Sequence, residues 1–293
     1  MTKKAQVIVV GSSNTDMILQ LDRIPRPGET ILGGEFAMAA GGKGANQAVA
    51  AARAGAAVTF VARVGRDIFG DQAIAGFEKD GIDVTHVTRD PVAPSGVALI
   101  FVAGTGENSI GVASGANARL SPQDVRNAEG AFASAGKSGV VLMQLETPLE
   151  TVEAGAELAA EYELRVILNP APARELSDEL LRRVSILTPN ETEAELLTGV
   201  AVDDEEAAAR AGKRLLDRGV DTVILTLGAR GALVVTRGDQ QRVPAFPVEP
   251  VDTTAAGDVF NGVLAVALAE GLDLPGAVRL ASAAALSVTR LGA

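Results

Sequence analysis

Short apolar runs alternate with longer amphipathic segments along most of the chain. The run Val7-Ile8-Val9-Val10 is rich in β-branched residues and leads into glycine and polar residues, which is typical of a buried parallel strand. Similar runs predict strands at residues 59–61, 140–145, 166–168, 186–187 and 222–227. Periodic segments predict helices at residues 69–80, 151–162, 207–218 and 276–289. This alternation predicts an α/β fold with a parallel sheet covered on both faces.

A second set of apolar runs is interrupted by glycine and proline, which is typical of antiparallel hairpins. These runs cover residues 17–21, 30–38, 95–102 and 109–112. We expect one small sheet, inserted at about residues 15–38 and 95–113 into a single domain of residues 1–293. A small sheet with an exposed apolar face is marginal alone, so it would be a lid over a site, a dimer interface, or both.

Polar side chains follow two of the predicted strands. Asn14 and Asp16 come shortly after residues 7–10, and Glu146 directly follows residues 140–145. Ligands of open α/β sheets bind at the carboxyl ends of the strands, so these side chains could face a polyol. The alternative for Asn14 and Asp16 is turn chemistry, because both residue types bond readily to nearby backbone.

A glycine-rich turn at residues 40–44 leads into an alanine-rich helix. The glycines would let a ligand touch the backbone, and Lys43 and Asn46 offer hydrogen-bond donors nearby. The spacing of a Walker A loop is absent. Close packing of the helix on a sheet is the alternative, which explains the alanines but not a lysine in the turn.

The stretch at residues 251–262 combines an extended segment with a helix start. Residues 253–257 are small or β-branched, whereas the apolar residues from Val259 onward suit a buried helix. The first N–H groups of a helix attract anions, and Asp258 lies at that start. Phosphoryl transfer needs such a pair, namely amides for developing negative charge and a base for the attacking hydroxyl. The alternative is a tight turn with Asp258 as a helix cap.

Asn190 and Glu193 follow the predicted strand at residues 186–187 and are three residues apart. If they open a helix, they share one face near its N-terminus, where their oxygens could hold Mg²⁺ through its waters. The alternative is ordinary helix capping, with acids favoured in the first turn. His86 is the only histidine, so it can form neither a histidine metal cluster nor a catalytic triad with a second one, and we assign it no role.

Composition narrows the classes of function. The chain has 293 residues, 47% of them hydrophobic, which suits a globular protein with a sizeable core. A net charge of -11 argues against nucleic-acid and anionic-membrane partners, and the absence of cysteine excludes disulfides and thiolate chemistry. The N-terminal residues show no signal-peptide pattern, and no apolar run is long enough to span a membrane, so we expect a cytoplasmic protein.

Two segments resemble the signatures of the ribokinase-like carbohydrate kinases, namely Gly41-Gly42-Lys43-Gly44-Ala45-Asn46 and Asp252-Thr253-Thr254-Ala255-Ala256-Gly257-Asp258. Further segments resemble this family in the same order, at residues 11–16, 144–148, 169–173, 188–195 and 226–231. The resemblance implies a three-layer α/β/α fold with a central, mostly parallel sheet and a small β-sheet lid that also joins two subunits of a homodimer. It implies ATP-dependent phosphorylation of D-ribose at its 5-hydroxyl, with Mg²⁺.

The resemblance also implies roles for individual residues. Asp258 matches the catalytic base, and the amides of Ala255, Ala256 and Gly257 match the anion hole. The sugar-binding positions, which include Asp258, also match Asn14, Asp16, Gly42, Lys43, Asn46 and Glu146. The nucleotide-binding positions, which include Gly257, also match Asn190, Thr226, Gly228, Gly231 and, with a different residue type, Ser282. Glu193 matches the acid that organises Mg²⁺ and phosphate through water.

A K⁺ site beside the anion hole is implied as well. Its ligand positions match Asp252, Thr254, Ser287, Arg290 and Gly292. Members of this family continue beyond the counterpart of Ala293 with a segment that carries one further ligand, so we expect an incomplete cation site.

Two other functions stay open. One is a kinase of the same family that acts on another small sugar, such as 2-deoxyribose. The other is an inactive sugar-binding sensor. The polar residues Asn14, Asp16, Lys43 and Glu146 favour a small free pentose, and the presence of Asp258 together with the glycine turn argues against a sensor.

Overall fold

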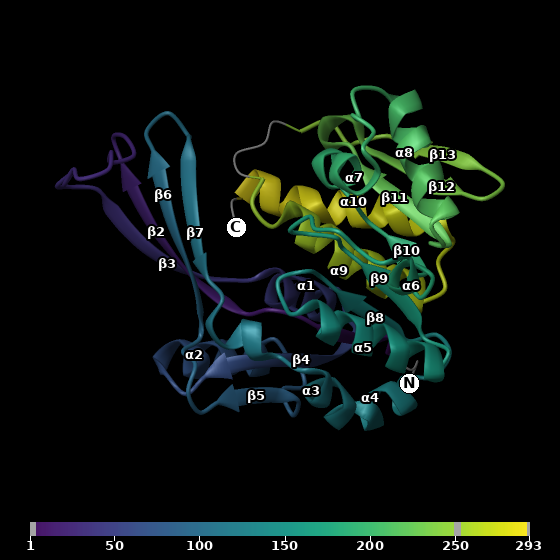
Figure 1. Cartoon of the computed structure of the whole chain (residues 1–293), viewed down its shortest axis with the longest axis horizontal. Helices are drawn as coiled ribbons and strands as arrows, with labels where there is room; N and C mark the ends of the chain where they lie inside the picture. Colours follow the sequence, from purple (N-terminus) through teal and green to yellow (C-terminus); the bar gives the residue numbers. More distant parts are fainter. Residues whose placement is uncertain (1–3, 249–252, 292–293) are drawn as a thin grey trace.

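A nine-stranded sheet forms the centre of the computed structural model, within residues 4–248 and 253–291, which the structure describes (Figure 1). Its strands are β1 (Gln6–Val10), β4 (Ala57–Gly65), β5 (Val87–Asp90), β8 (Val140–Met143), β9 (Arg165–Leu168), β10 (Ile186–Leu187), β11 (Thr222–Thr226), β12 (Ala232–Thr236) and β13 (Gln240–Val243). The spatial order is β13-β12-β11-β10-β9-β8-β1-β4-β5. Neighbours from β11 to β5 are parallel, and the pairs β11–β12 and β12–β13 are antiparallel, so the sheet is mostly parallel.

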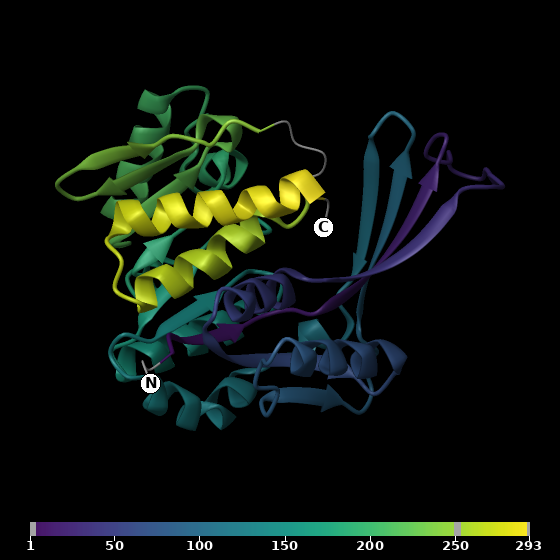
Figure 2. The ribbon, with the colours of Figure 1, turned by 180° about the vertical axis from the view of Figure 1, so that it is seen from behind.

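Helices cover both faces of this sheet (Figures 1 and 2). One face carries α3 (Pro122–Asn127), α4 (Glu129–Ala135), α5 (Leu149–Glu161), α6 (Asp178–Leu181), α7 (Glu191–Thr198) and α8 (Glu205–Asp217). The other carries α1 (Lys43–Arg53), α2 (Ile68–Lys79), α9 (Ala256–Ala269) and α10 (Leu274–Leu291). Alternate side chains of a strand point to opposite faces, so Ile8 and Val10 join one core, and Val7 and Val9 join the other. The predicted three-layer α/β/α fold is confirmed.

The small sheet stands apart from the main layers (Figures 1 and 2). Its strands are β2 (Asn14–Leu21), β3 (Glu35–Gly41), β6 (Gly96–Ala103) and β7 (Asn108–Ala113), in the order β3-β2-β6-β7. The two outer pairs are antiparallel hairpin-like pairs, and β2 and β6 run parallel. The prediction that a strand covers residues 30–34 is wrong, because Gly33 and Gly34 adopt φ values of 96° and 103°, which a strand cannot accommodate.

Other elements were not predicted from the sequence. They are the edge strands β5 and β13, the strand β12 beside β13, the short helices α3, α4 and α6, and the 3₁₀ turns η1 (Gly115–Arg119) and η2 (Gly228–Arg230). The start of α3 carried a readable signal, because Ser121 caps it, Pro122 follows, and Asp124 completes a capping box. No helix in the described ranges is long and apolar enough to cross a membrane.

Candidate active site

A cavity of about 210 Å³ lies where the carboxyl ends of several parallel strands meet the start of α9. The predicted site residues among those that line it are Lys43, Asn190, Glu193, Thr226, Ala255, Gly257 and Asp258. They come from segments far apart in the sequence. The sheet brings these segments together because its parallel strands end at the same edge.

Asp258 is held by two amides and does not cap its helix. Its Oδ2 accepts from the Nδ2 of Asn46 and its Oδ1 from the Nε2 of Gln47, each over 3.0 Å. The N-cap position belongs to Ala255. Burial raises the pKa of the Asp258 carboxyl, while the charge of Lys43 and the two amides act in the opposite direction. The alternative in which Asp258 caps α9 is therefore wrong.

The chain turns sharply at Ala255, just before α9. Its φ of 59° and ψ of 2° are left-handed, a conformation that is uncommon for residues other than glycine. The N–H of Ala256 donates to the carbonyl of Thr253 over 3.2 Å and closes the turn. A Cβ built on Gly257 would meet no atom within 4 Å, so the space beside the helix start is open. The helix dipole makes this open space favourable for an anion.

The glycine turn packs against the connection from β1 into β2. A Cβ on Gly41 would clash with the carboxylate of Asp16, and one on Gly42, whose φ is 90°, would lie too close to the backbone N of Asn14. This close packing of the turn accounts for both glycines. It also places the turn directly against two predicted sugar-binding residues.

Glu146 lies in the loop that follows β8, where two donors fix it. Its Oε2 accepts from the Oγ of Ser12 over 2.5 Å and from the N–H of Lys43 over 2.9 Å. Burial, with a contribution from the negative charge of Glu146, raises the pKa of Asp16 to about 6. Two carboxylates thus lie near the glycine turn, where they could accept hydrogen bonds from neutral hydroxyl groups.

Asn190 and Glu193 form a capping box at the start of α7. The Oδ1 of Asn190 accepts from the N–H of Glu193 over 2.8 Å, and the Oε2 of Glu193 accepts from the N–H of Asn190 over 2.9 Å. The alternative of ordinary helix capping is therefore confirmed. Both side chains also line the cavity. Burial raises the pKa of Glu193. Thr226 lies beside this box, because its backbone forms an isolated parallel bridge with Asn190.

Three predicted nucleotide-binding residues, Gly228, Gly231 and Ser282, do not line this cavity. Gly228 begins the turn η2 and Gly231 follows it, with φ values of 53° and 93°. The Oγ of Ser282 donates to the carbonyl of Val278 within α10 over 2.8 Å. Two of the predicted K⁺ ligands, Asp252 and Gly292, lie outside the described residues.

The other K⁺ ligand positions are described only in part. Thr254 lies just before α9, and Arg290 belongs to the last turn of α10. Ser287 also lies in α10, where its Oγ donates to the carbonyl of Ala284 over 2.7 Å.

Sequence reasoning missed several buried polar residues around Asp258 and Asn14, namely Gln47, Asn117, Gln144, Asn169, Thr188 and Asn261. Gln47 and Asn261 each lie within a largely apolar helix. A buried amide needs hydrogen-bond partners, so these two interruptions were the signal in the sequence that could have indicated a polar network. The Oγ1 of Thr188 donates to the Oδ1 of Asn261 over 2.7 Å. The Nδ2 of Asn261 donates to the carbonyl of Gly257 over 2.8 Å, which ties β10 to the start of α9.

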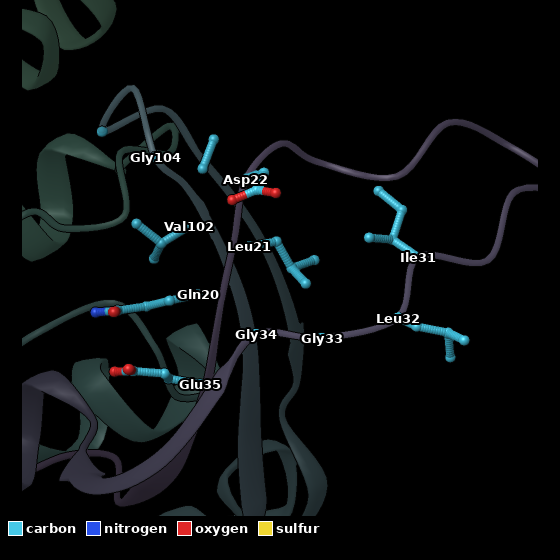
Figure 3. A pocket seen from close by; sticks show the side chains of 12 residues that line it. Gln20, Leu21, Asp22, Ile31, Leu32, Gly33, Gly34, Glu35, Val102 and Gly104 are labelled. Atoms are coloured by element: carbon cyan, nitrogen blue, oxygen red, sulfur yellow. The ribbon is translucent and has the colours of Figure 1, made fainter.

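A larger cavity, of about 520 Å³, lies on the small sheet (Figure 3). It is bordered by the end of β2 and by the loop that carries Ile31 and Leu32. None of the predicted catalytic, sugar-binding or nucleotide-binding residues lines it, so it does not belong to the candidate site.

The model of the pfkB family of carbohydrate kinases matches residues 4–293 of this chain. The chain belongs to the pfkB family. Its relatives include the ribokinase of Haemophilus influenzae, which is 48% identical over 97% of this chain and 92% of the relative. The deoxyribokinase of Salmonella typhi is 41% identical over 98% of this chain and 93% of the relative.

Solved structures agree with this pfkB family assignment. A structure of Arabidopsis thaliana ribokinase complexed with ribose and ATP has a TM-score of 0.90 and 31% identity, and it covers 100% of this chain and 94% of its own. Membership of the pfkB family makes this protein a phosphotransferase that acts on a sugar hydroxyl, and it implies the use of ATP with a divalent metal. The resemblance seen in the two signature segments is confirmed.

Proposed function

We propose that this chain transfers the γ-phosphoryl group of ATP to the 5-hydroxyl of D-ribose and releases D-ribose 5-phosphate. The observation that carries the proposal is the position of Asp258, a buried carboxylate in the first turn of α9 and in the wall of a cavity at the carboxyl edge of the sheet. The 48% identity with a ribokinase supports ribose as the sugar.

In this proposal Asp258 acts as the general base. It takes the proton of the 5-hydroxyl while the hydroxyl oxygen forms a bond to the γ-phosphorus and the bond to the β–γ bridging oxygen breaks. A carboxyl whose pKa is raised by burial is a stronger base than an exposed one, which suits this role. The N–H groups of Ala255, Ala256 and Gly257 would stabilise the charge on the transferred group. Of these, the N–H of Ala256 would exchange its bond to Thr253 for the phosphoryl oxygen.

The base of the lid and the glycine turn would bind the sugar. Asp16 can only accept hydrogen bonds when ionised, so it suits two adjacent sugar hydroxyls. Lys43 and Asn46 supply donors, and the second oxygen of Glu146 supplies a further acceptor. The contact between Gly41 and the Asp16 carboxylate supports this assignment, because it fixes the acceptor at the mouth of the turn.

The capping box and the end of β11 would bind the phosphates of ATP. No group of three or more His, Asp or Glu side chains within the described ranges is arranged to hold a metal ion. Asn190 and Glu193 are the polar residues beside the proposed phosphate site. They fit Mg²⁺, because this ion keeps several waters and is held largely by substrate phosphates. Asn190 and Glu193 would contact the waters of the ion, and the bound ion would neutralise phosphate charge. Gly228, Gly231 and Ser282 would lie along the remainder of the nucleotide.

We also propose a monovalent cation site, a homodimer and a cytoplasmic location, where ATP is available. K⁺ would lie near Thr254 and the end of α10, and would support the turn at Ala255. The lid exposes large apolar side chains, namely Phe36, Met38, Leu99, Ile110 and Val112. Such a surface supports association with a second copy of the chain through the lid.

An ADP-release assay with a panel of free sugars tests the proposed function. We expect kcat/KM for D-ribose to exceed that for 2-deoxyribose by about 10-fold or more, because the deoxy sugar leaves a buried hydrogen-bonding group unpaired. The 41% identity with a deoxyribokinase makes the reverse preference the alternative result. Sugar binding without ADP release would indicate a sensor and contradict the proposal.

A further inference from the structure

Both oxygens of Asp258 accept hydrogen bonds from consecutive residues of α1, Asn46 and Gln47. This arrangement requires α1 and α9 to pack very closely. At Gly262, four residues after Asp258, a Cβ would lie 2.7 Å from the Cβ of Ala50 and 2.7 Å from the carbonyl oxygen of Gln47. The glycine therefore allows the helices to approach until short amide side chains reach the carboxylate.

Gln47 is fully buried, with an exposed fraction of 0%, and all its side-chain polar atoms are hydrogen-bonded. Its Nε2 donates to the Oδ1 of Asp258 over 3.0 Å and to the Oδ1 of Asn169 over 3.2 Å. Its Oε1 accepts from the Nε2 of Gln144 over 2.6 Å. Asn169 in turn donates its Nδ2 to the carbonyl of Thr188 over 3.2 Å, so its Oδ1 faces Gln47. Only the Nε2 of Gln47 can therefore face Asp258.

Gln144 retains a buried oxygen without a hydrogen bond. Its Oε1 finds no donor among the described residues, and it lies against Gly11. An unpaired buried acceptor is destabilising, and each such group in a native structure requires an explanation. Here the Nε2 of the same amide makes the short bond that orients Gln47, and the unpaired oxygen is a consequence of that orientation.

We propose that Gln47 is a positioning residue for phosphoryl transfer, which holds the Asp258 carboxylate toward the attacking hydroxyl and is itself oriented by Gln144. The inference rests on the proposed function, because it takes Asp258 as the base. Gln47 does not line the cavity, so its effect passes through Asp258. A base must be directed at the proton that it removes, and small misplacements at a reacting centre lower the rate strongly.

The variant Gln47→Met tests this role, because methionine is unbranched and apolar and can fill a similar volume. We expect kcat to fall by about 10- to 100-fold, because this factor corresponds to the contribution of one hydrogen bond to a charged group. The KM values for ribose and ATP should change far less, because the lost interaction matters in the transition state. The matched control is Thr151→Val on the opposite face of the sheet, which removes a buried bond of 2.6 Å to the carbonyl of Leu120. It should lower the melting temperature and leave kcat unchanged.

A double-mutant cycle separates positioning from a general structural effect. In the Asp258→Ala background, Gln47→Met should cause no further loss of the residual rate, since no carboxylate remains to be positioned. Loss by the same factor in both backgrounds would overturn the proposal.

If Gln47→Met does not fold, Gln144→Met provides the second variant, because it removes the orienting donor and leaves Gln47 in place. It should give a smaller fall in kcat that again disappears in the Asp258→Ala background. Unchanged kcat in the variant tested would overturn the proposal. Failure of the proposed function has a different signature, since the unmodified chain would then release no ADP with any sugar.

Discussion

The Nδ2 of Asn117 donates to the Oδ1 of Asn14 over 2.7 Å, and this bond determines which end of the Asn14 amide can face a ligand. Asn117 is itself fixed, because its Nδ2 also donates to the carbonyl of Ser13 over 3.0 Å and its Oδ1 accepts from the N–H of Ser13 over 2.9 Å. With its oxygen occupied, Asn14 presents the donor Nδ2. The base of β2 thus offers a donor at Asn14 close to an acceptor at Asp16.

The near-isosteric variant Asn117→Asp should raise the ribose KM by about 3- to 10-fold, the value of one neutral hydrogen bond. The new carboxylate would accept from the Nδ2 of Asn14, so the Asn14 amide would rotate and turn its oxygen toward the sugar. The ATP KM and kcat should change little. Steady-state kinetics with each substrate varied in turn provide the measurement, and equal effects on both KM values would contradict the orientation argument.

The sequence was informative where one local pattern carries the chemistry. The β1 run, the glycine turn and the small residues before Asp258 each mark a strand or helix boundary by a local change of residue type, so their positions could be predicted. Gln47 could not be assigned, because its partner depends on how α1 crosses α9, and the glycine that permits the crossing, Gly262, resembles any other helix glycine. The strand β13 was missed for a different reason, since its exposed polar residues show no apolar run.

The variant Asp258→Asn should lower kcat by about 10²- to 10⁴-fold, because the amide keeps the shape of the side chain but cannot accept the proton. Ribose binding, measured by calorimetry, should be largely retained. The structure adds a second expectation. The new amide must turn its own donor toward the amide nitrogen of either Asn46 or Gln47, so the melting temperature should fall as well. Turnover close to that of the unmodified chain would remove Asp258 from the role of base.

The affinity for ribose should depend on pH through Asp16. Its pKa of about 6 lies above the ordinary value, so protonation begins near neutral pH and is nearly complete one unit below that pKa. The protonated carboxyl loses acceptor capacity, so the dissociation constant for ribose should rise as the pH falls through this range. Calorimetry without ATP measures the effect. The matched variant Asp16→Asn should bind ribose weakly at every pH, and a pH dependence that persists in it would assign the titration to another group.

Potassium should raise kcat if a cation supports the turn at Ala255. Amides that a cation holds in place need not reorient during transfer. Loss of one oxyanion donor lowers kcat by about 10²- to 10³-fold, so this factor is an upper bound for the effect of potassium. Na⁺ should be less effective, because oxygen sites discriminate ions by size and ligand number. Activity at constant ionic strength in K⁺, Na⁺ and a bulky organic cation measures this. Equal kcat in all three salts would show that no functional cation site exists.

Ala255 should tolerate glycine. At its φ of 59° an L-residue is strained, and glycine removes this strain while increasing the entropy of the unfolded chain. The two effects oppose each other, so the free energy of unfolding of Ala255→Gly should change by less than about 1 kcal/mol. The matched control is Ala256→Gly, one residue later, where the chain is already helical. Its free energy of unfolding should fall by at most about 0.5–1 kcal/mol, the difference between alanine and glycine in the middle of a helix.

Ala255→Val tests whether the left-handed turn is needed for catalysis. A β-branched residue is a genuine outlier at positive φ, so the turn must rearrange and redirect the N–H groups at the start of α9. We expect kcat to fall by about 10²-fold or more, because the loss of a single oxyanion donor has an effect of this size. Ribose affinity should be retained, since Asn14, Asp16 and the glycine turn lie on other elements. Chemical denaturation separates this outcome from unfolding. A folded Ala255→Val enzyme with unchanged kcat would show that the turn does not position the groups that stabilise the transferred phosphoryl group.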